Sequence, residues 1–234
     1  TGAELVAEKW NLSREDLDKF ALESHQKAAH ATESKYFDQE ILPVEGRNSE
    51  GMKDLVMADE GIRFDASLDK LAGLNPVTEG GVITAGNASQ ITDGAAAVMV
   101  CNDAGLKKIQ ASPRAEIVSI SVVGDDPVFM LTGPIPASIQ ALKTANLTID
   151  DMDLYEVNEA FAPVPLAWAE ELKADRSKLN VNGGAMALGH PLGATGAKLM
   201  TTLLHEMERR ESTYGLQAIC EGGGTANATI IKRI

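Results

Sequence analysis

The stretch Asn182–Met200, NGGAMALGHPLGATGAKLM, combines five glycines with one histidine, His190. The apolar segment Lys178–Val181 before it is predicted to form a strand, and the segment Ala194–His205 is predicted to form a helix. Glycines at such a junction allow close backbone approach and direct several N–H groups, together with the positive helix end, towards one point. On this stretch alone, a ligand-binding loop and a tight turn with an incidental histidine are equally good interpretations.

The C-terminal half of the chain alternates between strand and helix patterns. Apolar runs predict strands at 115–123, 154–157, 179–181, 216–220 and 226–231, and helical spacing predicts helices at 136–145, 162–172 and 194–210. This β-α-β-α-β-α-β-β order predicts an α/β fold in which a mixed sheet is covered by helices.

The first part of the chain has a different character, because its pattern is polar, helix-rich and irregular, as in a lid rather than a sheet core. Residues Ser13 to Asp16 form a capping-box-like helix start. The expected elements are helices at 1–10, 13–33 and 63–74 (with Leu68 and Leu71 facing inward), a short strand at 41–44 and a polar loop at 45–53.

The segment Ala95–Cys101, AAAVMVC, is apolar without interruption. Such a run predicts a strand that is buried on both faces, as in a parallel sheet. Cys101 at its end is then interpreted as a small core residue. A helix at 102–109 is expected to follow.

The composition restricts the class of protein. The chain has 234 residues, 44% of them hydrophobic, and a net charge of −13, which argues against a nucleic-acid surface. Cys101 and Cys220 are its only cysteines, so a disulfide framework is excluded. No run reaches the ~18 apolar residues of a membrane span, and no nucleotide-loop motif or metal-spaced histidine pair is present. We therefore expect a cytoplasmic enzyme without membrane, nucleic-acid or metal partners.

Three polar clusters follow predicted strands, and together they favour a catalytic site. Asn158 follows the strand at 154–157, His190 follows the strand at 179–181, and Cys220 begins the sequence CEGGG. Because functional groups in such folds gather at the carboxyl ends of strands, an amide, an imidazole and a thiol are expected to converge there. Taken singly, Asn158 could form a turn, Cys220 could be a buried small residue and the glycines could form a hairpin bend.

The same clusters resemble the C-terminal half of a thiolase. The similarity lies in Asn158–Ala162 (NEAFA), Gly183–Gly196 (GGAMALGHPLGATG) and Cys220–Gly224 (CEGGG), in that order. Thr84–Ser89 (TAGNAS) is similar to the segment that returns from the lid of that family. The resemblance implies part of the lid at 1–86, the last strand and helix of the N-terminal thiolase half at 87–113, and a thiolase-like C-terminal domain at 114–234.

The resemblance implies acyl transfer between coenzyme A thioesters, which are substrates, with no permanently bound cofactor. Carried over residue by residue, His190 would activate the nucleophilic cysteine, and Cys220 would act as the acid and base. Asn158 would hold a water that stabilises the enolate-like oxygen together with His190. The N–H of Gly222 would help to hold the oxyanion of the acyl-enzyme.

The resemblance also implies how the substrate is held. Ser89 would contact the pantetheine arm, Phe161 would form a wall of the acyl pocket, and Arg63 would meet the phosphates or adenine of coenzyme A. The full-length protein would form a homo-oligomer, either a dimer or a tetramer.

The chain departs from the family pattern in one respect, because the nucleophilic cysteine of thiolases lies in an N-terminal half that is expected to be absent here apart from its last strand and helix. Cys101 has no matching motif and is not interpreted as the nucleophile. We therefore expect a fragment of a longer polypeptide, or a chain that requires a complementary partner chain, and expect it to be inactive alone. The alternative interpretation is a non-catalytic, thiolase-like subunit that binds coenzyme A.

Overall fold

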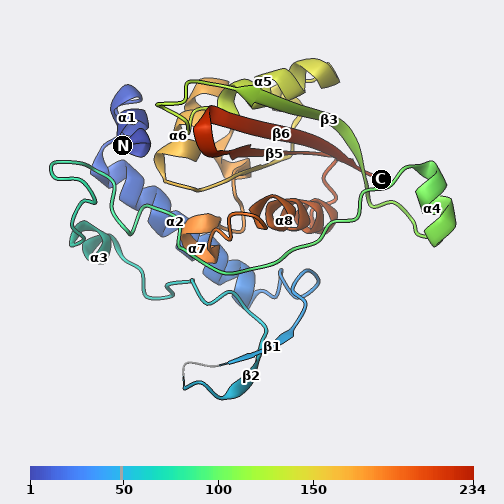
Figure 1. Ribbon diagram of the computed structural model, residues 1–234, viewed down its shortest axis with the longest axis horizontal. Helices are drawn as coiled ribbons and strands as arrows, with labels where there is room; N and C mark the ends of the chain where they lie inside the picture. The colour runs from blue at the N-terminus through green and yellow to red at the C-terminus, as the bar shows by residue number, and fades with distance from the viewer. Residues whose placement is uncertain (48–49) are drawn as a thin grey trace.

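The C-terminal half of the protein is built on one four-stranded sheet with the order β3-β6-β5-β4. The computed structural model describes residues 1–47 and 50–234 (Figure 1). β4 and β5 pair in parallel, whereas β6 pairs antiparallel with both of its neighbours, so the sheet is mixed as predicted. The strands, each confirmed to within two residues at either end, are β3 (Ala115–Gly124), β4 (Leu154–Val157), β5 (Tyr214–Cys220) and β6 (Thr225–Arg233).

Helices cover both faces of this sheet, which confirms the predicted α/β architecture (Figure 1). Side chains alternate along β4, so Tyr155 packs edge-on against Trp168 of α6, while Leu154 packs on the opposite face with α8. Glu156 therefore shares the α8 face with Leu154, a placement that matters for the site below. The covering helices are α5 (Pro134–Ala145) and α6 (Pro163–Leu172) on one face and α8 (Thr195–Arg209) on the other.

The strand predicted at 179–181 is not formed as a strand. Leu179 makes a single bridge to Tyr155 of β4, after a 3₁₀ turn at Arg176–Lys178. Asn180 has a positive φ of 45°, which interrupts the extended backbone. Its side-chain amide accepts from the Val157 N–H at 2.9 Å and donates to the Val157 carbonyl at 2.9 Å. A side chain therefore makes the two hydrogen bonds that a neighbouring strand would make.

The first two N-terminal helices confirm the sequence prediction closely. The capping box at the start of α2 is present, because Ser13 and Asp16 each cap the other's backbone N–H. A predicted helix at 63–74 is shorter in the structure, where Leu71 is buried but Leu68 is exposed. Helices α1 (Gly2–Lys9), α2 (Arg14–Glu33), α3 (Leu68–Ala72) and α7 (Ala185–Leu188) lie below and beside the sheet (Figure 1).

Two predictions for the region around residue 50 are wrong. The strand expected at 41–44 lies further along, at β1 (Val44–Arg47), and the expected loop at 45–53 contains most of β1. β1 pairs antiparallel with β2 (Lys53–Val56), with Val44 opposite Val56. Charged residues occupy half of the positions in each strand, so the apolar alternation that marks a strand is missing from the sequence. Residues 48 and 49 of the predicted loop lie outside the described residues.

The segment 95–101 contradicts its prediction. It forms no strand, the side chains of Met99 and Val100 are 75% and 70% exposed, and Cys101 is exposed rather than a core residue. A strand forms only when neighbouring strands pair with its backbone groups, and none of the described strands pairs with this segment. The following helix, α4 (Asp103–Ile109), confirms its prediction and is capped by the Asn102 side chain.

These exposed apolar side chains predict that the isolated chain binds the dye ANS. Ile120 and Val122 on β3 are also 57% and 72% exposed. Each such side chain contributes about 1.5–3 kcal/mol when buried, so covering a handful of them rivals the stability of a whole domain. Strong ANS fluorescence is expected, and a Met99→Lys/Val100→Lys variant should lower it more than Leu42→Lys does. A compact monomer with a cooperative melt and no ANS binding would contradict this prediction.

Candidate active site

Asn158 and Cys220 lie at the same end of two neighbouring parallel strands. The Asn158 N–H donates to the Ala218 carbonyl at 3.0 Å, which continues the β4–β5 pairing by one residue. Cys220 is the last residue of β5. The carboxyl ends of parallel strands are where an open α/β sheet presents its functional groups, so this edge is the candidate site.

The loop after Asn180 brings His190 to this edge and holds its backbone. Gly189 has a φ of +82°, a conformation that favours glycine, and the His190 N–H donates to the Gln90 carbonyl at 3.1 Å. The imidazole Nδ1 lies 2.6 Å from the hydroxyl oxygen of Thr195, the first residue of α8. Because that hydroxyl donates to the Pro191 carbonyl at 3.1 Å, it accepts from Nδ1–H, and Nδ1 carries the proton.

The other ring nitrogen of His190 faces Asn158. Nε2 lies 3.3 Å from the Asn158 side-chain nitrogen, which donates to it. Burial, helped by the positive charge of Lys198, lowers the pKa of His190 below its ordinary value. The imidazole is therefore neutral at pH 7 and presents a basic Nε2. The structure thus brings together two of the three groups that the sequence analysis singled out.

Cys220 ends the adjacent strand and is half-buried. Burial raises the pKa of its thiol to about 11, so the sulfur carries its proton at neutral pH. Within the described part of the chain, no hydrogen bond joins Cys220 to Asn158 or His190. A protonated thiol at a strand end can donate a proton to a carbanion, which is acid catalysis rather than metal binding.

The buried carboxyl group of Glu159 forms hydrogen bonds with three segments near this edge of the sheet. Glu159 accepts from the Ser24 hydroxyl at 2.7 Å, from the Asn180 amide at 3.0 Å and from the Met186 N–H at 3.2 Å. It therefore joins α2, the turn after β4 and the glycine-rich loop. Sequence reasoning missed Glu159 and Thr195, although a charged residue inside an apolar segment and a hydroxyl at a helix start were both visible signals.

Two family descriptions match the chain, one over its C-terminal part and one over its N-terminal part. The family description "Thiolase, C-terminal domain" matches residues 111–233, and "Thiolase, N-terminal domain" matches residues 1–104. The chain belongs to the thiolase family. It is 55% identical over 233 residues to the steroid 3-ketoacyl-CoA thiolase FadA6 of Mycobacterium tuberculosis, covering 100% of this chain and 56% of that protein. It is 45% identical over 231 residues to the mitochondrial 3-ketoacyl-CoA thiolase of Rattus norvegicus, covering 98% and 58%.

Solved structures of thiolases share the fold. The acetyl-CoA acetyltransferase of Bacillus anthracis superposes with a TM-score of 0.95 at 40% identity, covering 100% of this chain and 59% of that one. Human mitochondrial 3-ketoacyl-CoA thiolase in complex with CoA superposes with a TM-score of 0.91 at 41% identity, covering 100% and 58%. The chain therefore spans less than two thirds of the length of the thiolases it matches.

Ser89 lies beside the residues that follow Asn158, among them Phe161. The Ser89 N–H donates to the Ala160 carbonyl at 3.0 Å, and Ala88 bridges Phe161, so the two segments run side by side. Gln90 extends this contact, because its side-chain amide donates to the carbonyls of Gly61 and Met186, both at 2.7 Å. Sequence reasoning did not single out Gln90.

Gly222 and Arg63 are both exposed. Gly222 is exposed at the tip of the β5–β6 connection, in the 3₁₀ turn Gly222–Gly224, with no atom within 4 Å of the position that a Cβ would take. Arg63 is exposed, and its backbone N–H donates to Nδ1 of His25 at 3.0 Å. No hydrogen bond in the described residues joins Arg63 to Asn158 or His190.

The residues that the structure describes contain neither a metal site nor a membrane-spanning helix. No group of three or more His, Cys, Asp or Glu side chains is arranged there to hold a metal ion. None of the described helices has both the length and the apolar character needed to cross a bilayer.

Proposed function

We propose that this chain is the C-terminal portion of a thiolase that converts a 3-ketoacyl-CoA and coenzyme A into acetyl-CoA and a shortened acyl-CoA, or runs the reverse condensation. The observation that carries the proposal is the contact between neutral His190 Nε2 and the Asn158 amide at the carboxyl edge of the sheet. The nucleophilic cysteine lies outside this chain. The full-length protein is a cytoplasmic homo-oligomer.

In the proposed mechanism, His190 Nε2 accepts the proton of that nucleophilic cysteine. The thiolate attacks the 3-keto carbon, whose oxygen becomes an oxyanion held in part by the Gly222 N–H. The C2–C3 bond then breaks, and its electron pair forms the enolate of acetyl-CoA. Asn158, through a water, and His190 stabilise the enolate oxygen, and the Cys220 thiol donates its proton to C2.

The second half of the reaction reverses the role of Cys220. Its thiolate, formed in the first half, accepts the proton of the incoming coenzyme A thiol. The coenzyme A sulfur attacks the acyl-enzyme carbonyl, and the nucleophilic cysteine leaves and recovers its proton from His190. Ser89 contacts the pantetheine arm, Phe161 lines the acyl pocket, and Arg63 meets the phosphates or adenine.

A chimeric enzyme tests this proposal. It joins this chain to the part of the Mycobacterium tuberculosis relative that the chain does not match, which is 44% of that protein because the match covers 56%. The chimera is expected to cleave acetoacetyl-CoA with coenzyme A, while this chain alone shows no turnover. A second chimera whose supplied nucleophilic cysteine is replaced by serine serves as the control and should be inactive.

Two outcomes would contradict the proposal. Turnover by this chain alone would show that no external nucleophile is needed. Binding of coenzyme A by a folded chimera that has no turnover would instead support the non-catalytic subunit.

A further inference from the structure

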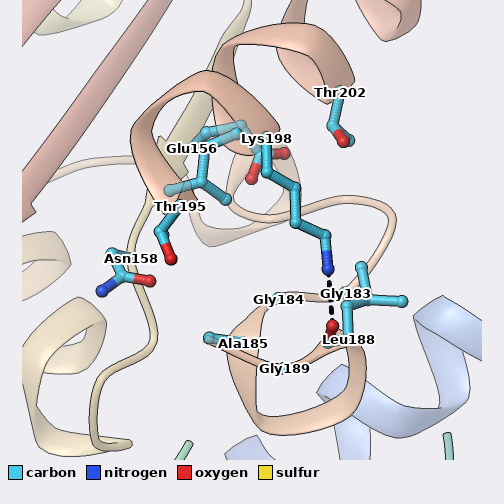
Figure 2. Close-up of a pocket in the computed structure, with 11 residues that line it drawn as sticks. Glu156, Asn158, Gly183, Gly184, Ala185, Leu188, Gly189, Thr195, Lys198 and Thr202 are labelled. Carbon is cyan, nitrogen blue, oxygen red and sulfur yellow. Dashed lines mark hydrogen bonds between the residues drawn. The ribbon is translucent and has the colours of Figure 1, made fainter. Parts of the chain in front are cut away.

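A small cavity lies between β4 and the start of α8, directly behind Asn158 (Figure 2). Glu156, Asn158, Thr195 and Lys198 contribute polar side chains to its lining. The space open to the centre of a water molecule is about 10 Å³, which is roughly the volume that one internal water needs. In Figure 2 the side-chain oxygen of Asn158 is turned towards the cavity and its nitrogen is turned away.

Two of the oxygens in this lining are buried acceptors that no described residue satisfies. They are Glu156 Oε2 and Asn158 Oδ1. A third such oxygen, Gln217 Oε1, belongs to the residue opposite Glu156 in the β4–β5 ladder, whose amide donates to the Gly196 carbonyl at 3.2 Å. Because an unsatisfied buried acceptor is costly, this cluster requires donors. Lys198 is engaged elsewhere, by the Leu188 carbonyl and Asp59.

Glu156 can itself supply a donor when its carboxyl group is protonated. Burial raises the pKa of Glu156 well above its ordinary value. The nearby carboxyl groups of Glu159, Glu40 and Glu206 raise this pKa further, whereas the positive charge of Lys27 lowers it. Burial raises the pKa of Glu159 as well, but three donors reach its carboxyl group and oppose the effect. A neutral carboxyl group has one O–H to give.

The orientation of the Asn158 amide depends on what faces it from the cavity. A donor in the cavity favours the observed orientation, with Oδ1 inward and the nitrogen towards His190 Nε2. An acceptor in the cavity would favour the flipped amide, which places Oδ1 against Nε2 and requires Nε2 to carry the proton. A base needs the lone pair on Nε2, so only the first arrangement serves the proposed role of His190.

We propose that one internal water bridges Glu156 and Asn158 in this cavity, and that the Glu156 hydroxyl, acting through it, fixes the Asn158 amide with its nitrogen towards His190. Glu156 is thus a positioning residue that keeps the proton of His190 on Nδ1. This inference rests on the proposed role of His190 in the thiolase reaction. Its first test does not use turnover, so the two can fail separately.

The tautomer of His190 is the direct readout. In a ¹⁵N-labelled chimera, two-bond ¹H–¹⁵N spectra are expected to show His190 as the Nδ1–H tautomer. Glu156→Gln keeps an N–H donor and should leave this signature unchanged, whereas Glu156→Met removes the donor and should shift His190 towards the Nε2–H form. Wild-type His190 in the Nε2–H form, or identical spectra for both variants, would overturn the proposal.

Kinetics and crystallography complete the test. Glu156→Met should lower kcat by about tenfold or more with little change in KM, a part of the ~10²–10⁴ that a positioned base contributes. Glu156→Gln should stay within about threefold of wild type. The matched control is Leu154→Ala, on the same face of β4, which should lower Tm without altering kcat or the tautomer. A high-resolution crystal structure of the wild-type chimera should show one ordered water between Glu156 and Asn158, and a dry cavity would overturn the proposal.

Discussion

His190→Ala in the chimeric enzyme is expected to lower kcat/KM for the thiolysis of acetoacetyl-CoA by about 10³-fold or more. The imidazole is proposed both to accept the proton of the nucleophile and to stabilise the enolate oxygen, and a positioned base and an oxyanion donor each contribute ~10²–10³ or more. The basic Nε2 beside Asn158 at 3.3 Å is the structural basis for the first role, and the proton that Nε2 then carries is the donor for the second. Steady-state assays with saturating coenzyme A measure the loss.

The same prediction has a pH signature and a matched control. Because burial lowers the pKa of His190, the basic form persists below about pH 6.5, and the acid limb of the kcat/KM profile should lie below that value. His30→Ala, which removes an exposed histidine from α2, should leave kcat/KM within about twofold. A loss of less than about threefold for His190→Ala would remove His190 from the proposed mechanism.

The C-terminal half of the fold, in which strands and helices alternate, was predictable because its own residues pair and pack with one another. The apolar runs that became β3, β4, β5 and β6 find their partners within the chain, so local pattern and final structure agree. The segment 95–101 has an equally clear strand pattern and no pairing among the described strands. Strand patterns therefore predict structure only where the neighbouring strands are present.

The candidate site was predictable in its chemistry and less so in its supporting contacts. Asn158 and His190 could be singled out because polar residues and glycines after apolar runs are visible in the sequence, and the structure places them in contact. Glu156 escaped notice, because its importance lies in which atoms it faces across the sheet and α8. Asn180 shows the same limit, since its side chain replaces a strand that apolar spacing predicted.

Cys220→Ser in the chimeric enzyme is expected to lower kcat for thiolysis by about 10³-fold or more. The proposed reaction needs one group that first donates a proton to C2 and then accepts one from the coenzyme A thiol. Burial raises the pKa of the Cys220 thiol to about 11, so the thiol holds a proton for the first step, and its thiolate forms far more easily than a serine alkoxide would for the second. The nucleophilic cysteine is untouched, so the acyl-enzyme formed from acetyl-CoA should remain detectable, although the leaving coenzyme A sulfur no longer receives a proton from Cys220.

Isotope exchange separates this role from a structural one. The wild-type chimera in deuterated water should incorporate deuterium into the methyl group of acetyl-CoA, because deprotonation there is the reverse of the proton donation assigned to Cys220. Cys220→Ser should abolish this exchange while the acetyl-enzyme remains detectable by mass spectrometry. Cys101→Ser, at the exposed cysteine, should change neither. Exchange that persists in Cys220→Ser would show that another group moves the proton.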